Sequence, residues 1–229
     1  MLSVYVLSSL LLMAAPAIAA PAPEDDDYNF SWLDPDKKVN VLQNRKYRKA
    51  MRPYVVAGGG LNLSNAFRSG YLGSLRGGFW ASEQFGVEAL GAFFGNADNA
   101  TLTALKNRTT VLPFVREIRG YFGGLVNWAP FYAKLNFFNS ILYFDWLINA
   151  GLGQVSTAND RNSTSGAQSN FVSESHFGFF FGTALNFYLS KNFSIRFDLQ
   201  GVNYGATGAD DKNRRFTSFD FTAGVGFML

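Results

Sequence analysis

Apolar and polar residues alternate along most of the chain after Arg52. Within Phe216–Leu229, for example, Phe219 and Phe221 are apolar, whereas Asp220 and Thr222 between and beside them are polar. A β-strand directs successive side chains to opposite faces. The pattern therefore predicts strands with one apolar and one polar face.

The same alternation predicts eight strands, each at or above the about 9–11 residues with which a tilted strand crosses a bilayer. An even number of strands of this length favours an all-β fold, an eight-stranded antiparallel transmembrane β-barrel of the up-and-down type. The expected strands cover residues 52–63, 70–80, 85–94, 117–127, 140–154, 176–189, 193–203 and 216–229.

The connections between these strands alternate between short and long. Ala81–Gln84 and Ser190–Asn192 are short, and short periplasmic turns opposite long extracellular loops are typical of outer-membrane barrels. Residues 128–139 differ, because they form an apolar connection containing Pro130, which we expect to follow the inner membrane rim. The long, polar connections are Asn96–Arg116, Val155–Ser175 and Asn203–Arg215.

The composition agrees with a membrane barrel. Charged residues make up 16% of the chain and aromatic residues 17%, yet the mean hydropathy is +0.00. Lipid-facing and lumen-facing residues cancel in such an average. A soluble β-sandwich also alternates, but it does not need Phe at nearly every position of one face. After residue 20, no window reaches the about 18 apolar residues of a spanning helix.

The N-terminal part of the chain has a different pattern. Residues 1–19 are uncharged and end in Ala17-Ile18-Ala19, which predicts a signal peptide cleaved after Ala19, with an uncleaved membrane anchor as the alternative. Residues 20–51 contain an acidic run, then Asp34-Pro35, which is typical of a helix start. We expect a partly helical periplasmic arm over 20–51, with a flexible leader as the alternative, and the barrel over 52–229.

Several kinds of chemistry are excluded by residue counts. The chain has no cysteine and a single histidine, so thiolate metal sites, disulfides and cysteine nucleophiles are absent. A formal net charge of +3 spread over the chain suggests no nucleic-acid partner. No phosphate-binding glycine loop or metal-ligand cluster stands out, and we expect no cofactor and no metal.

The alternation also assigns side chains to the two faces of the barrel wall. We expect the charged strand residues to fill the lumen as a network of ion pairs, in which Arg196 pairs with Asp198, Asp220 or Asp145. The expected lumen charges are Arg76, Glu88, Glu117, Arg119, Asp145, Arg196, Asp198 and Asp220. The expected lipid-facing residues are Phe177, Phe179, Phe181, Phe187, Ile195, Phe197, Leu199, Phe219, Phe221, Val225 and Phe227.

His176 is a candidate catalytic residue. Glu174 lies two positions away on the same strand face, and Ser173 and Ser175 are adjacent in sequence. A serine, histidine and carboxylate could hydrolyse a lipid ester at the membrane surface. Neighbours within one strand rarely have the geometry of a triad, so the simpler interpretation is a histidine at the polar rim of the barrel, and we expect no catalytic residues.

Short segments resemble a known family. They are Val41–Tyr47, Ser82–Glu88 and Pro130–Leu135, the last leading into Tyr143–Asp145. Together they resemble the outer-membrane β-barrel domain proteins of myxobacterium-like Gram-negative bacteria, over most of residues 40–229. The resemblance implies an eight-stranded outer-membrane barrel and no reaction, since this family is defined by its fold.

The last strand also resembles a recognition signal. Thr222–Leu229 has the alternating apolar residues read by the barrel-assembly machinery, with its aromatic residue at Phe227 and Leu229 at the end. We therefore expect a monomer in the cell outer membrane of a Gram-negative bacterium, in contact with outer-membrane lipids, lipopolysaccharide and the barrel-assembly machinery. Its expected role is structural, or surface interaction through the extracellular loops. The alternatives are a lipid A-modifying enzyme and a narrow ion or solute channel.

Overall fold

The computed structural model describes residues 45–65, 67–108, 115–138, 140–159, 172–208 and 212–229. They belong to one compact unit, Arg45–Leu229. The expected signal peptide and most of the expected arm lie outside the described residues. Segment 45–51 of that arm is described and contains turns and irregular backbone.

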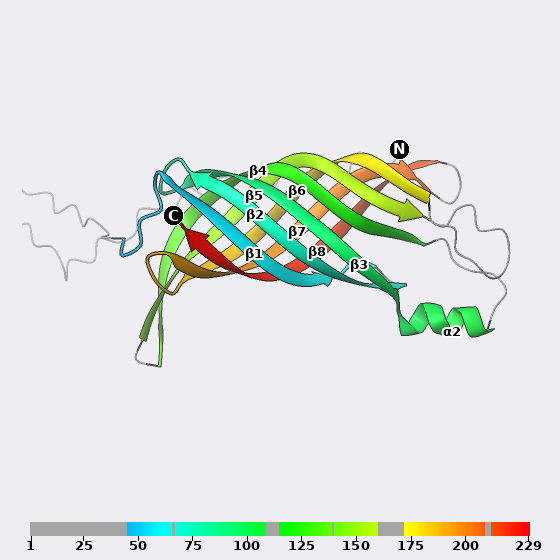
Figure 1. Cartoon of the computed structure of the whole chain (residues 1–229), viewed down its shortest axis with the longest axis horizontal. Coiled ribbons are helices and arrows are strands. Elements are labelled where there is room, and N and C mark those ends of the chain that lie inside the picture. The colour runs from blue at the N-terminus through cyan, green and yellow to red at the C-terminus, as the bar shows by residue number, and fades with distance from the viewer. Residues whose placement is uncertain (1–44, 66, 109–114, 139, 160–171, 209–211) are drawn as a thin grey trace, which may run out of the picture. The chain divides into compact units, whose positions relative to one another are not determined.

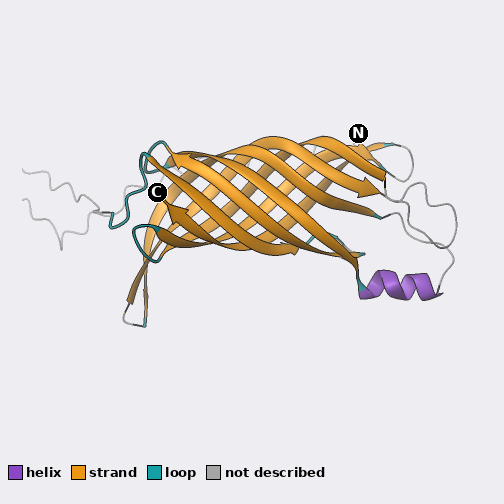
Figure 2. Ribbon diagram, viewed as in Figure 1, coloured by secondary structure: helices purple, strands orange, loops and turns teal. Residues whose placement is uncertain are grey.

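Eight antiparallel strands and one helix make up this unit (Figure 1, Figure 2). We call the end of the barrel that carries the helix α2 the outer end, and the end with the short turns the inner end. The elements are β1 (Arg52–Asn62), β2 (Arg68–Trp80), β3 (Phe85–Asp98), α2 (Ala100–Arg108), β4 (Arg116–Phe137), β5 (Ser140–Asn159), β6 (Val172–Tyr188), β7 (Phe193–Thr207) and β8 (Asn213–Met228).

The sheet closes on itself. Each strand pairs with the next along the chain, and β1 pairs antiparallel with β8, from Tyr54 opposite Met228 to Asn62 opposite Asp220. Closure gives the backbone groups of every strand partners on both sides, so no described strand is an open edge. The predicted eight-stranded antiparallel barrel is confirmed.

The two faces of the wall differ as the alternation requires. On β8, Phe219, Phe221 and Val225 are 40%, 41% and 59% exposed, whereas Asp220 and Thr222 are buried in the lumen. The residues expected to face lipid all lie on the outer face, with Phe181, Phe187 and Ile195 half-buried among their neighbours. The outside of the barrel is therefore apolar, and its buried inside holds both polar and apolar side chains.

The expectation that residues 128–139 only connect two strands is wrong. β4 continues to Phe137 and β5 starts at Ser140, so the two strands form a long hairpin beyond the inner end (Figure 2). Their register shifts between Trp128 and Phe131, where Pro130 stands. Proline has no N–H for the ladder, and a bulge accommodates it without ending the strand.

The loop expected over Asn96–Arg116 contains a helix instead. β3 runs on to Asp98, and Asn99 then caps α2, because its Oδ1 accepts a hydrogen bond of 2.9 Å from the Leu102 amide. Side-chain capping of this kind satisfies an amide that has no partner within the helix. Among the described residues, no helix is long and apolar enough to cross a membrane.

The lumen is filled in layers. Toward the outer end lies an apolar cluster that includes Leu72 and Phe180, and toward the inner end lies another that includes Trp80. Arg76 lies between Leu72 and Trp80 on β2, so a charged layer separates the two apolar clusters. Packing is tight enough that a Cβ at Gly153 would lie 2.3 Å from the ring of Phe180.

Candidate functional site

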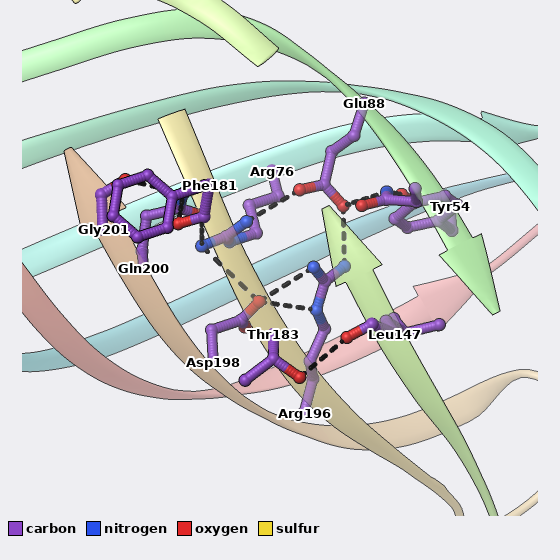
Figure 3. Close-up of polar contacts among 11 residues, drawn as sticks. Tyr54, Arg76, Glu88, Leu147, Phe181, Thr183, Arg196, Asp198, Gln200 and Gly201 are labelled. Carbon is purple, nitrogen blue, oxygen red and sulfur yellow. Dashed lines mark hydrogen bonds and ion pairs between the residues drawn. The ribbon is translucent and has the colours of Figure 1, made fainter. Parts of the chain in front are cut away.

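The centre of the lumen holds a closed set of ion pairs, the lumen cluster, formed by Arg76 of β2, Glu88 of β3, and Arg196 and Asp198 of β7 (Figure 3). Arg76 Nη1 lies 2.8 Å from Glu88 Oε1, and Arg196 Nη1 lies 2.6 Å from Glu88 Oε2. Asp198 Oδ1 lies 2.8 Å from Arg196 Nη2 and 3.5 Å from Arg76 Nη2. All four side chains are at most 3% exposed, and their formal charges cancel.

Neutral side chains add hydrogen bonds to the lumen cluster. Tyr54 donates to Glu88 Oε2 over 2.6 Å, and Asn127 Nδ2 donates to the same oxygen over 3.1 Å. Gln200 accepts a bond of 3.4 Å from Arg76 and donates to the carbonyl of Phe181 over 2.9 Å. Such hydrogen bonds offset part of the cost of burying the charges. The lumen cluster thus connects β2, β3 and β7 across the lumen.

A second buried pair lies toward the inner end. Lys49 Nζ lies 2.5 Å from Asp145 Oδ2, and each side chain is 1% exposed. Tyr188 donates to the same oxygen over 2.6 Å. The Lys49 ammonium also lies 4.1 Å from the centre of the Trp80 ring, a favourable distance for a cation–π interaction. We call Lys49, Asp145 and Tyr188 the inner stopper.

The segment before β1 holds Lys49 in this position. Glu83 lies in the turn after β2, and its carboxylate accepts a hydrogen bond of 3.3 Å from the Arg45 guanidinium. It also accepts hydrogen bonds from the backbone amides of Lys49 and Ala50. Tyr47 stacks on the ring of Tyr188 at 5.5 Å. The arm expected over 20–51 includes Lys49, and the sequence analysis missed its place in the lumen. Nothing in the sequence pattern distinguishes Lys49 from the neighbouring Lys46 and Arg48.

The outer end carries a further polar group, the outer cluster, formed by Arg116, Thr157, Glu174 and His176. Arg116 Nη1 lies 3.0 Å from Glu174 Oε2 and 3.1 Å from Thr157 Oγ1. His176 Nε2 lies 3.1 Å from Thr157 Oγ1 and 3.4 Å from Glu174 Oε2. Arg116 Nη2 donates to the carbonyl of Thr207 over 2.7 Å.

The two serines beside His176 lie on the other face of β6. Ser173 and Ser175 are exposed on the outer face, whereas Glu174 and His176 point toward the lumen. Successive side chains of a strand diverge in this way. The described residues therefore do not bring the considered serine, histidine and carboxylate together as a triad.

Two other expected lumen charges are buried with partners outside the clusters described above. Glu117 is buried and pairs with Arg68 at 2.8 Å. Asp220 is buried and accepts from Asn62 over 2.7 Å. Arg196 thus pairs with Asp198, as one of the alternatives held, and with Glu88, whereas Asp145 and Asp220 have other partners.

The expectation that Arg119 belongs to the lumen is wrong. Its side chain is 50% exposed, and its Nε lies 3.8 Å from Glu117 Oε1. The ladder between β4 and β5 shifts register between Ile118 and Gly120. An extra residue at a bulge breaks the period of two, so alternation counted from the middle of β4 misplaces Arg119.

Metal binding has no support in the described part of the chain. There, no group of three or more histidine, aspartate or glutamate side chains is placed to hold a metal ion.

No family model and no curated protein matches the sequence. Solved structures do resemble the fold. The N-terminal β-barrel domain of Pseudomonas aeruginosa OprF is 12% identical, with 79% of this chain and 98% of that chain covered and a TM-score of 0.49. Neisserial surface protein A is 9% identical, with 77% and 96% covered and a TM-score of 0.49. Ail of Yersinia pestis is 14% identical, with 79% and 99% covered and a TM-score of 0.40.

Proposed function

We propose that this protein is an integral outer-membrane β-barrel with a closed lumen, whose role is structural or is surface interaction at its outer end. The observation that carries the proposal is the apolar outer face of a closed barrel. Phe93, Phe122 and Phe177 are 76%, 61% and 71% exposed on the outer face of the barrel. Such side chains are stable in lipid and unfavourable in water.

The lumen supports a structural role over transport. An eight-stranded barrel is only wide enough for side chains to fill its interior. Here the lumen cluster and the inner stopper occupy that interior at two levels, with Arg76, Arg196 and Lys49 each 1% exposed. A continuous water-filled path is not expected through side chains that are excluded from solvent to this degree.

The direction of insertion follows from the two ends. The short turns at the inner end are typical of the periplasmic side, and the longer connections and α2 of the extracellular side. The arm over 20–51 would then lie in the periplasm. Lipopolysaccharide would surround the outer half, and the barrel-assembly machinery would read Thr222–Leu229. The resemblance to the barrels of myxobacterium-like bacteria belongs to this proposal as well.

Two measurements test the proposal on the purified full chain. Gel mobility in SDS should change on boiling, because a closed barrel keeps its internal hydrogen bonds until heated. In planar bilayers, the protein should give no steady conductance, while a wide porin in the same chamber conducts. Unchanged mobility would contradict the membrane barrel, and steady conductance would contradict the closed lumen and favour the channel.

An opened variant sharpens the conductance test. Replacing both Arg76 and Arg196 by Ala removes the two guanidinium groups that span the lumen, and conductance should appear if the plug is what blocks ions. The matched control replaces Arg119 by Ala, because that arginine lies outside the lumen, and it should stay silent.

A further inference from the structure

We propose that the outer mouth of the barrel is a binding site for a single sugar unit that carries an acidic group. A pocket of ≈ 200 Å³ opens there between the ends of five strands, space on the scale of one small ring. Its walls include Asn62, Asn96, Arg116, Tyr204, Phe216 and Ser218. This inference rests on the proposed orientation, because only then does the mouth face the cell exterior.

The pocket ends on a solid floor. Asn62 Nδ2 donates to Ser218 Oγ and to Asp220 Oδ1, each over 2.7 Å, and Asp220 is fully buried. These bonds join β1 to β8 across the base of the pocket. The pocket is therefore a concave site at the mouth of the barrel, a common position for ligand sites in β-barrels, and no entrance to a channel.

One wall of the pocket is a rigid aromatic surface. The rings of Tyr204 and Phe216 stack with centroids 5.9 Å apart and planes at 24°. The ring of His176 stacks on Tyr204 at 5.7 Å and 23°. Stacking holds these rings in place before any ligand arrives. Tyr204 is buried between His176 and Phe216, so the half-buried Phe216 is the ring that a sugar could contact.

Other lining residues of the pocket offer groups that form hydrogen bonds. Asn96 Nδ2 is held by the carbonyl of Ile118 at 2.7 Å, and Asn65 Nδ2 by the carbonyl of Arg116 at 3.2 Å. Ser218 keeps its hydroxyl proton as a donor, since its oxygen accepts from Asn62. Amides and hydroxyls fixed in this way match the hydroxyl edge of a sugar.

The one charged side chain of the pocket could pair with an acidic ligand that shares it with Glu174. Arg116 is the single charged residue among its described lining residues, and the guanidinium carbon lies 5.3 Å from the centre of the Phe216 ring. Glu174 pairs with Nη1 of Arg116 but keeps 30% of its side chain exposed. A ligand carboxylate or phosphate could share that guanidinium, whose planar fork suits such groups. No carboxylate lines the described part of the pocket, so a cationic ligand has no counter-charge there.

The test is saturation-transfer NMR on the folded full chain in detergent micelles. The probes are glucuronate, galacturonate, glucose, galactose, inorganic phosphate and benzoate. We expect transfer to the hexuronates and at least tenfold weaker binding of the neutral hexoses. Transfer to benzoate alone would overturn the sugar assignment in favour of an aromatic acid, and phosphate binding alone would show an anion site without a sugar. No transfer to any probe would overturn the site.

Two matched variants locate the binding. Arg116→Gln should reduce hexuronate binding to the level of the neutral hexoses, whereas Arg119→Gln, on the same strand but outside the pocket, should bind as the parent does. Phe216→Ser should weaken neutral and acidic sugars alike. Each variant is first checked for heat-modifiable mobility, so that loss of binding is read only from folded protein. Equal binding by the parent and by Arg116→Gln would overturn the role of the guanidinium.

A competition arm distinguishes the sources of such a sugar. Lipopolysaccharide with acidic core sugars is added to the micelles in the presence of glucuronate. A fall of the glucuronate signal assigns the pocket to a surface lipid, and an unchanged signal assigns it to a soluble or host glycan. Failure of the membrane proposal would appear in the mobility and bilayer experiments, which do not depend on sugar binding.

Discussion

The lumen cluster and the outer cluster use the same chemistry, an arginine held by a glutamate, with different consequences. In the lumen cluster, Arg196 is 1% exposed and its partner Glu88 is 0% exposed. In the outer cluster, Arg116 is 5% exposed but its partner Glu174 is 30% exposed. The first arginine is sealed among partners on all sides, whereas the second borders a pocket. Burial of the partner thus decides whether an ion pair closes a lumen or forms one wall of a site.

Removal of the central arginine should have the largest effect on stability. Arg196→Ala leaves Glu88 and Asp198 buried with less compensation, and breaking a buried ion pair costs about 3–5 kcal/mol. Arg116→Ala should cost about 1 kcal/mol, because its partner is partly solvated and such pairs are weak. Urea unfolding in lipid vesicles measures both. Similar losses for the two variants would remove the contrast between the clusters.

A double-mutant cycle sharpens the same comparison. Arg196→Ala combined with Glu88→Gln should be less destabilising than the sum of the single changes, because the second change removes the stranded charge. The losses of stability caused by Arg196→Ala and by Asp220→Asn should be additive in the double variant. Coupling to Asp220 instead of Glu88 would contradict the observed partners.

The next largest loss of stability should depend on how deep in the membrane a residue of the outer face lies. Phe197→Arg, near the middle of β7, should destabilise the inserted barrel by about 2–4 kcal/mol. Phe177→Arg, at the outer edge of the apolar face of β6, should cost about 0–1 kcal/mol, because the charge can reach the interface. The free energy of unfolding in vesicles distinguishes the two variants. Gln200→Asn, on the lumen face, is the control, and its effect should not depend on depth in the membrane. Equal losses at Phe197 and Phe177 would mean that the apolar face does not contact lipid as proposed.

Loss of the lysine at the inner end should have a moderate effect. Lys49→Met removes the ammonium from Asp145, but Tyr188 continues to donate to that carboxylate and water can approach from the inner mouth. We expect a loss of about 2 kcal/mol, within the range for hydrogen bonds to charged groups. Lys46→Met is the matched control and should be nearly neutral. A neutral Lys49→Met would show that the inner stopper contributes nothing to the closed lumen.

The alternation alone was sufficient to predict the eight strands and the faces of their walls. Phe197, Phe221 and Asp198 lie where a period of two places them, because the direction of a side chain in a strand is a local property of the backbone. The period failed where the backbone inserts an extra residue. Arg119 and Pro130 stand at such irregularities. A proline is a local sign of a bulge, whereas nothing in the local composition marks Arg119.

The partners of the buried charges were decided only by the tertiary structure. Two strands must first pair in one register, and the sheet must then close, before Arg196 meets Glu88 across the lumen or Lys49 reaches Asp145 from outside the strands. Register and closure depend on contacts between segments distant in sequence, which no local pattern contains. The sequence by itself thus determined that a charged interior exists inside an apolar wall, and the closing of the barrel decided which charges form a plug and which border a pocket.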